Sequence, residues 1–420
     1  MGSGAREHAL VWKLAGEASV SAVICAPGNP GTVSVARPAA IAPTDLDGLV
    51  ALARRERIDL TVVGPEQPLA LGLADRFAGA GLLLFGPTQA AARLETSKAF
   101  AKDFMTRHRI PTARYRTCRS VREARDAVAD VGLPVVVKAD GLAAGKGVTV
   151  ALDAAAAEAA IEAAMVARQF GEAGSTLVVE EFLSGEEASF FCLCDGTRAS
   201  PVGTAQDHKR AYDDDRGPNT GGMGAFAPSR LVTDEVHRVV MREIVEPALD
   251  GLREEGAPYR GFLYVGLMVG AAGPRVVEFN VRFGDPEAQV VLPMIAEDLA
   301  PMLAEAACGR LSRTSCTLSV DPHVGVVLAS GGYPGAFEKG RPIQGVDASA
   351  ALDGVLVFHA GTVVRDGRLL TDGGRVLTIV GRGPDFPTAI ARAYAGVSRV
   401  SFEGMHARRD IGRTAVAAQR

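Results

Sequence analysis

The first ninety residues alternate short apolar runs with a stretch of helical spacing, and a turn rich in glycine and proline follows each run. The apolar runs are 20–25, 60–63 and 82–85, and the turns are 27–31, 64–68 and 86–88. Between the first two runs, residues 45–57 carry apolar side chains at helical spacing. Strands that alternate with helices predict a parallel, doubly wound sheet, in which ligands bind beyond the carboxyl ends of the strands. We therefore expect the three turns to face a ligand.

The segment Gly2-Ser3-Gly4 opens a helix that matches a dinucleotide-binding fingerprint only in part. The third glycine of G-x-G-x-x-G is absent, and no acidic residue ends a strand about 20 residues further on. This disfavours a nicotinamide cofactor. The amino end of a helix still suits the phosphate of a small substrate.

Charge and hydropathy exclude several classes of protein. The 420 residues include 45 Lys and Arg against 49 Asp and Glu, a net charge of −4, which argues against binding to a nucleic-acid backbone. No run reaches the roughly 18 apolar residues of a membrane span, and charged residues interrupt any signal peptide. We expect a cytoplasmic monomer that acts on small molecules, with neither nucleic acid nor a membrane as partner.

From about residue 93 the pattern changes to antiparallel strands, and a glycine-rich turn joins the first two. Strands are predicted at 135–138 and 148–152, and the turn between them reads D-G-L-A-A-G-K-G. It is not a P-loop, because Gly147 follows Lys146 where Ser or Thr is required, and because it joins two strands. Such a hairpin can still close over phosphates, with Lys138 and Lys146 supplying positive charge. The alternative is a tight structural turn.

Residues 277–283 place polar and apolar side chains on opposite faces of one predicted strand. Because side chains alternate along a strand, Glu278, Asn280 and Arg282 share a face, and the apolar residues among them form a packing face. Carboxylate and amide oxygens suit Mg²⁺, which completes its shell with water and phosphates. Arginine suits a phosphate or a carboxylate. An ordinary solvated strand face would alternate in the same way.

Two further polar segments are candidate binding regions. The acidic turn from Glu180 to Glu187 could bind an adenine edge through its backbone and ribose hydroxyls through its last carboxylate, although a solvated hairpin tip would look alike. Residues 203–229 are polar and glycine-rich, and they predict a long loop close to a ligand.

The order and spacing of these motifs resemble the phosphoribosylamine–glycine ligases, ATP-grasp enzymes of purine synthesis, over essentially the whole chain. The matching strings include G-S-G-A-R-E-H-A, V-K-A-D-G-L-A-A-G-K-G-V, G-P-N-T-G-G-M-G, E-F-N-V-R-F-G-D-P-E and S-G-G-Y-P-G. Two alternatives stay open: another ATP-grasp ligase or carboxylase of purine metabolism, and an ATP-binding module without activity. The intact pair Glu278 and Asn280 argues against the second.

The resemblance implies a reaction and the residues that carry it. Glycine would be joined to 5-phosphoribosylamine with ATP and Mg²⁺ or Mn²⁺, through glycyl phosphate, by charge neutralisation and positioning. The catalytic residues would be Lys138, Lys146 and Arg282. ATP would be bound by Lys98, Lys138, Gly141, Gly145, Lys146, Gly147, Glu180, Glu181, Phe182, Leu183, Glu187, Lys209, Arg210 and Asn219. The metal would be bound by Glu278 and Asn280. The other substrates would face Gly2, Ser3, Gly4, Pro27, Gly28, Asn29, Pro65, Glu66, Gly284 and Asp285.

The resemblance and the change of pattern together imply a multidomain α/β and α+β chain. We expect a parallel, doubly wound N-terminal domain at 1–92, an ATP-grasp region at 93–318 with a lid subdomain at about 112–183, and a small mixed α/β domain at 319–420. In the family an apolar strand precedes G-S-G, whereas here Gly2 follows Met1. We therefore expect the first strand to be missing, with an open slot beside residues 20–25.

Overall fold

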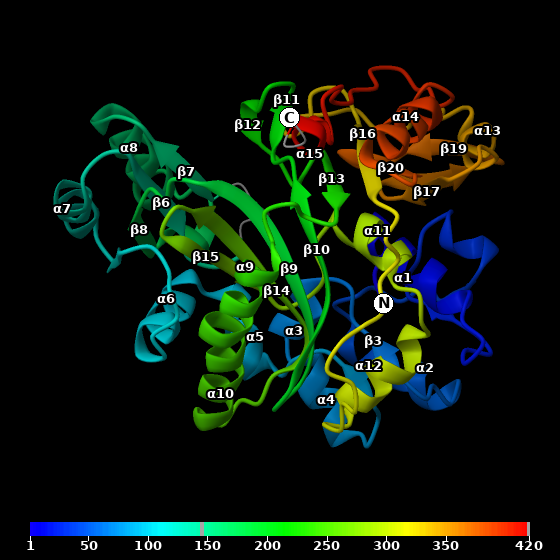
Figure 1. Cartoon of the computed structure of the whole chain (residues 1–420), viewed down its shortest axis with the longest axis horizontal. Helices are drawn as coiled ribbons and strands as arrows, with labels where there is room; N and C mark the ends of the chain where they lie inside the picture. Colours follow the sequence, from blue (N-terminus) through cyan, green and yellow to red (C-terminus); the bar gives the residue numbers. More distant parts are fainter. Residues whose placement is uncertain (143–146, 418–420) are drawn as a thin grey trace.

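The computed structural model describes residues 1–142 and 147–417 of the chain. Figure 1 shows an N-terminal region in blue, a central region that runs from cyan to yellow, and a C-terminal region in orange and red. The fold is multidomain and mixed α/β, as expected. Within the described ranges, no helix is long and apolar enough to cross a membrane.

Short parallel strands form the N-terminal sheet, as the alternating pattern predicted. The parallel pairs are β1 (Ile24–Cys25) with β2 (Arg37–Pro38), and β3 (Thr61–Val62) with β4 (Leu84–Phe85). Met1 and Gly2 lie between the two pairs: the Met1 ammonium donates to the Val62 carbonyl at 2.9 Å, and Gly2 N donates to the Ala26 carbonyl at 2.7 Å. Met1 and Gly2 therefore fill the carboxyl end of the slot that was expected to be open.

Two helices of this region were predicted, one opened by Gly2-Ser3-Gly4 and one at 45–57, and both form. Asp45 Oδ1 accepts the N–H of Gly48 at 2.9 Å and caps the predicted helix at 45–57. The helices are α1 (Ala5–Ala15), α2 (Leu46–Arg55), α3 (Glu66–Ala70), α4 (Leu73–Gly79) and α5 (Gln89–Thr96). Because α3 begins just after the turn that follows β3, Glu66 lies at the carboxyl edge of the sheet.

A separate four-stranded antiparallel sheet, in the order β5-β8-β6-β7, contains the predicted glycine-rich hairpin. Its strands are β5 (Tyr115–Cys118), β6 (Val135–Ala139), β7 (Val148–Ala151) and β8 (Leu177–Glu181). The helices around it are α6 (Lys98–Arg107), α7 (Val121–Val131) and α8 (Ala154–Ile161), and α8 continues into a π-helical turn at Glu162–Val166. Buried alanines and valines of the sheet, α7 and α8 form one core. This subdomain lies at the left of Figure 1, far from the C-terminal region.

One eight-stranded antiparallel sheet runs through the central and C-terminal regions, in the order β15-β14-β9-β10-β13-β16-β20-β17. Its strands are β9 (Glu186–Asp195), β10 (Ala199–Asp207), β13 (Gly224–Ala227), β14 (Arg260–Gly270), β15 (Gly273–Asn280), β16 (His323–Ala329), β17 (Val355–His359) and β20 (Arg375–Arg382). The C-terminal strands therefore extend the same sheet that carries the predicted metal pair.

The predicted long loop at 203–229 is wrong, because this stretch forms strands. It contains the end of β10, the hairpin β11 (Arg210–Tyr212) and β12 (Arg216–Asn219), and β13. Its glycines reflect close approach rather than a loop: a Cβ on Gly203 would lie 2.6 Å from Val291, and one on Gly224 would lie 2.7 Å from the Gly325 carbonyl.

The remaining elements cover this sheet or cap its C-terminal end. They are α9 (Asp234–Val240), α10 (Glu246–Glu254), α11 (Ala288–Val291), α12 (Leu299–Ala307), α13 (Val346–Ala350), β18 (Thr362–Arg365), β19 (Arg368–Thr371), α14 (Phe386–Val397) and α15 (Arg413–Ala417). Helix α14 packs against β20 and β16. The sheet is thus backed by helices on both sides of its central strands (Figure 1).

Candidate active site

The turns at the carboxyl edge of the N-terminal sheet meet one another, as predicted. Gly28 N donates to the Gly2 carbonyl at 3.1 Å. The Asn29 amide donates to the Ser3 carbonyl at 2.9 Å and to the His359 carbonyl of β17 at 2.7 Å. The predicted substrate residues Gly2–Gly4 and 27–29 therefore form one surface, which the C-terminal region closes on one side.

Glu7, which the sequence analysis missed, occupies the amino end of α1. Its carboxylate accepts the N–H of Gly4 at 2.6 Å and pairs with Arg6 Nε at 2.6 Å. A Cβ on Gly2, Gly4 or Gly64 would lie closer than 3.0 Å to this side chain. The glycines therefore make room for an internal carboxylate, which accepts one N–H group at this helix end.

Arg282 joins the end of β15 to the N-terminal region. Its Nε lies 3.2 Å from Glu66 Oε2, and its Nη2 lies 2.7 Å from Glu95 Oε1. Arg6 Nη1 lies 4.0 Å from the same Glu66 oxygen and donates to the Phe283 carbonyl at 3.2 Å. Burial lowers the pKa of Arg282, but Glu95 and Glu66 raise it by more, so the net pKa lies above its ordinary value and the guanidinium stays charged. The predicted substrate residue Glu66 is thus shared between two guanidinium groups.

Arg375, also missed, brings β20 of the C-terminal region to the same place. Its Nη2 lies 3.1 Å from the Asp285 carboxylate, and its Nη1 donates to the Asp285 carbonyl at 2.7 Å and to the Gly221 carbonyl. Gly284 and Asp285, predicted to face substrate, lie directly after Arg282 and Phe283. All three regions of the chain therefore contribute to one junction.

On the other side of β15, Glu180 is buried between two lysines. Its carboxylate pairs with Lys102 and with the predicted ATP residue Lys138. Burial lowers the pKa of Lys102 to about 8, against the opposing effect of Glu180. The side chain of Glu180 is therefore engaged in an internal ion triad, and Lys102 was not assigned to the site from the sequence. The adenine contact predicted for the backbone of residues 180–183 stays a prediction.

The corner between α5 and α6 holds the start of the predicted hairpin. Lys98 Nζ donates to the Gly141 carbonyl at 2.9 Å, and Asp140 accepts the N–H of Ala99 at 3.1 Å. At the other end of the hairpin, Gly147 accepts the N–H of Ala139 at 2.8 Å. Gly145 and Lys146 lie outside the described residues.

The remaining predicted nucleotide residues lie on two facing hairpins. Glu181 pairs with Arg114 and Arg275, and Phe182 and Leu183 lead into β9. Glu187, at the start of β9, pairs with Lys209. Arg210 and Asn219 face each other across β11 and β12. The structure thus brings Glu187 and Lys209 together, whereas Glu181 fastens β8 to β15.

Glu278 and Asn280 lie two residues apart on β15, as predicted, and three lysines affect the pKa of Glu278. Burial raises the pKa of Glu278, but Lys209, Lys138 and Lys98 lower it overall. Across the strand pair, Glu278 faces Gly266, which has no side chain. In the described part of the chain no three His, Cys, Asp or Glu residues gather as a metal site. Two oxygen donors among lysines nevertheless fit Mg²⁺, which is commonly held by few protein ligands together with phosphates.

The Asn280 side chain is oriented by its neighbours. One end of its amide lies 3.1 Å from Glu95 Oε1 and 3.2 Å from the Phe279 carbonyl, and since both neighbours are acceptors, the amide nitrogen is assigned to that end. Glu95 Oε2 also accepts the N–H of Val281 at 2.7 Å. Burial raises the pKa of Glu95 to about 7, with Arg282 opposing that effect. Residue Glu95 carried no signal in the sequence pattern.

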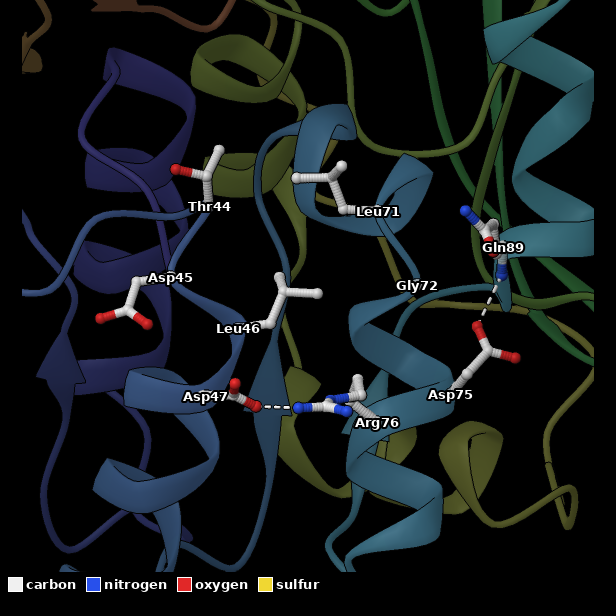
Figure 2. Close-up of a pocket in the computed structure, with 9 residues that line it drawn as sticks. All are labelled: Thr44, Asp45, Leu46, Asp47, Leu71, Gly72, Asp75, Arg76 and Gln89. Carbon is white, nitrogen blue, oxygen red and sulfur yellow. Dashed lines mark hydrogen bonds and ion pairs between the residues drawn. The ribbon is translucent and has the colours of Figure 1, made fainter.

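A pocket of about 590 Å³ lies apart from this junction, between α2, α4 and the start of α5 (Figure 2). Its charged groups are engaged with one another and with the backbone. Asp45 caps α2, Arg76 pairs with Asp47, and Asp75 accepts the N–H of Gln89 at 2.8 Å. Because no described polar group converges on an open centre there, the junction around β15 is the candidate site.

Three family models match the chain in succession. The N domain of phosphoribosylglycinamide synthetase matches residues 1–95, its ATP-grasp (A) domain matches 96–288, and its C domain matches 323–414. The chain is 51% identical to the phosphoribosylamine–glycine ligase of Allochromatium vinosum, over 100% of this chain and 99% of that protein. It is 52% identical to that of Xanthomonas axonopodis pv. citri, over 100% and 98%.

Solved structures give the same picture. The crystal structure of phosphoribosylamine–glycine ligase from Thermotoga maritima superposes with a TM-score of 0.84 at 34% identity, over 97% of this chain and 98% of that chain. A biotin carboxylase domain of 2-oxoglutarate carboxylase from Hydrogenobacter thermophilus superposes with a TM-score of 0.73 at 18% identity, over 97% and 90%. The second likeness concerns the fold alone.

Proposed function

The chain belongs to the phosphoribosylamine–glycine ligase family, and from that premise we propose how its residues divide the work of the reaction. The protein is an ATP-grasp ligase that joins glycine to 5-phosphoribosylamine in purine biosynthesis, and it uses ATP and a divalent metal. The all-oxygen pair Glu278 and Asn280 supports Mg²⁺ or Mn²⁺ as that metal. When bound, the metal would neutralise charge on the transferred phosphoryl group.

We place the two chemical steps along β15. A glycine carboxylate oxygen would attack the γ-phosphorus of ATP, the bond to the β,γ-bridging oxygen would break, and ADP would leave. The phosphoribosylamine nitrogen would then attack the carbonyl carbon of glycyl phosphate, lose a proton, and expel phosphate. Lys98 and Lys138 would hold the phosphates. Arg282, oriented by Glu66 and Glu95, would hold the acyl phosphate.

One observation carries this proposal. The lysines of the nucleotide side act on Glu278, and four residues later Arg282 contacts the acids of the N-terminal region. A single strand end therefore faces both the predicted ATP site and the predicted substrate site. We also propose that the protein acts as a monomer, which light scattering would check.

Isotope transfer tests the proposed chemistry. With glycine labelled by ¹⁸O in its carboxylate, one labelled oxygen should appear in the phosphate released on ligation. Phosphate without label would contradict attack by the glycine carboxylate. ADP release should require both glycine and phosphoribosylamine, and release with another carboxylate or amine would favour a different ATP-grasp ligase.

A substitution tests the metal pair. Glu278→Ala should lower ligation by about 100-fold or more, because a ligand of the metal that neutralises the transferred phosphoryl group is lost. The opposite strand face does the packing, so the unfolding temperature should change little. Glu254→Ala, on the exposed face of α10, is the matched control. Near wild-type activity of Glu278→Ala at saturating Mg²⁺ would remove Glu278 from the site.

A further inference from the structure

A single buried carboxylate contacts three consecutive residues at the end of β15. Glu95 lies in the last turn of α5 and is 9% exposed. Its Oε2 accepts the N–H of Val281 at 2.7 Å. Its Oε1 meets both the Asn280 amide, at 3.1 Å, and Arg282 Nη2, at 2.7 Å.

The chemistry of the two groups fixes which way the Asn280 amide faces. Both oxygens of Glu95 already face donors, the Val281 N–H and Arg282 Nη2, and therefore act as acceptors, whereas a carboxamide has a donor end and an acceptor end. Glu95 and the Phe279 carbonyl are both acceptors, and both lie at the same end of the Asn280 amide, so that end must be the nitrogen. The amide oxygen is therefore directed away from Glu95. A rotated amide would set its oxygen against two acceptors and would present N–H groups where a cation needs an oxygen.

We propose that Glu95 is a positioning residue for the divalent metal, which it serves by locking the Asn280 carboxamide with its oxygen available as a ligand. This rests on the proposed function, since it takes Asn280 as a metal ligand. Residues that orient a metal ligand through a hydrogen bond commonly alter metal affinity by 10–100-fold when they are replaced.

Glu95→Gln separates this role from packing. A glutamine has nearly the same size, and its oxygen can still accept the Val281 N–H. Its nitrogen would then lie where Oε1 lies now, against the donors of Asn280 and Arg282. Asn280 would rotate to offer its oxygen to this nitrogen, and it would turn its own nitrogen toward the cation.

The companion change Asn280→Asp should restore the pairing of donor with acceptor between residues 95 and 280. In the double variant, an aspartate at position 280 can accept from the side-chain nitrogen that Glu95→Gln introduces with one oxygen and keep the other for the metal. We therefore expect Glu95→Gln to weaken metal binding when residue 280 is Asn, and to leave it unweakened when residue 280 is Asp.

The experiment measures Mn²⁺ binding by electron paramagnetic resonance in the presence of ADP, so that no turnover is required. The four proteins are wild type, Glu95→Gln, Asn280→Asp and the double variant, with Glu254→Gln on exposed α10 as control. Glu95→Gln should raise the Mn²⁺ dissociation constant about 10–100-fold in the Asn280 background. Unfolding temperatures report whether each variant folds.

Two results would overturn the proposal. One is unchanged Mn²⁺ binding in Glu95→Gln. The other is an equal loss in both backgrounds, which would indicate an effect of charge or packing rather than of amide orientation. Failure of the proposed metal site itself would show differently, since Glu278→Ala would then bind Mn²⁺ as tightly as wild type.

Discussion

Lys102, Glu180 and Lys138 form a buried triad. Loss of its anion should lower the stability of this region much more than loss of one cation. The three residues are 3%, 4% and 5% exposed, and the Glu180 carboxylate pairs with both lysines. Glu180→Gln leaves two buried ammonium groups without an anion. Lys102→Met leaves a one-to-one pair of Glu180 with Lys138.

The pKa of Lys102 sets the size of the difference. Its value falls from 10.5 to about 8 even with Glu180 present, so keeping it charged at neutral pH costs about 3 kcal/mol. Without Glu180 its pKa would fall further, and losing the proton at pH 7 costs at most about 5 kcal/mol, which is about 2 kcal/mol more than in wild type. Lys138 also loses its anion in this variant. We expect Glu180→Gln to destabilise this region by about 3–5 kcal/mol, because it leaves buried charge uncompensated. Lys102→Met should stay within about 1.5 kcal/mol of wild type, since it removes a charge that is costly to bury.

Hydrogen exchange of the β6 and β8 amides, followed by mass spectrometry at pH 7, gives the opening free energy of this sheet in each variant. The pH dependence supplies a second signature. Because the folded pKa of Lys102 lies below the unfolded one, the unfolded state binds more protons between about pH 8 and 10.5. Over that window wild type should therefore gain up to about 3 kcal/mol relative to Lys102→Met. Two results would refute the reasoning. One is a Glu180→Gln variant that is as stable as Lys102→Met. The other is an opening free energy that changes with pH in the same way in wild type and Lys102→Met.

Two contacts at the edges of the site lead to further predictions. Burial raises the pKa of Glu181, but the Arg114 N–H and the Arg114 and Arg275 side chains lower it to about 2; its stabilising effect should thus be complete above about pH 4.5 and be lost as the pH falls toward 2. Glu181→Gln should flatten that part of the acid-unfolding curve, and an unchanged curve would count against the contact. Arg375→Met should raise the KM for phosphoribosylamine about 10-fold or more, because charge-assisted hydrogen bonds to Asp285 are lost, while the KM for ATP changes little. Arg365→Met, on the exposed hairpin of β18, is its control, and an equal rise in both KM values would contradict the assignment.

The parts of the fold that follow from local periodicity could be predicted from the sequence. The hairpin of β6 and β7 appears as two valine-rich runs about a glycine-rich turn, and the structure pairs Val135 with Ala151 as an antiparallel hairpin requires. The alternation at 277–283 likewise placed Glu278 and Asn280 on one face, because the side-chain period of a strand is two. In each case the partners lie within about 15 residues of each other along the chain.

Two of the residues that were missed, Glu95 and Arg375, have partners far away in sequence. Glu95 contacts a backbone group 186 positions away, and Arg375 contacts one 90 positions away. Their burial and charge pairing arise only when the three regions assemble, so no local pattern marks them. The predicted loop at 203–229 is wrong for a related reason. Its glycines indicated a loop, whereas they are required where neighbouring backbone and Val291 approach β10 and β13.

The predicted metal ligands lie at one strand end, and the backbone of that strand helps to hold the site together. Successive residues on one face of a strand are roughly 7 Å apart, so the backbone itself fixes the spacing of Glu278 and Asn280. The predicted strand at 277–283 ends earlier, at Asn280, so Arg282 lies two residues beyond β15. The groups of the nucleotide side reach β15 through side chains instead: Lys138 Nζ donates to the Val277 carbonyl at 3.3 Å, and Glu181 pairs with Arg275. The predicted metal and acyl-phosphate groups thus lie at one edge of a hydrogen-bonded frame that continues through the eight-stranded sheet to Arg375. The side chains of the four-stranded sheet contact that frame through ion pairs and hydrogen bonds, which are the contacts that substitution and pH can weaken separately.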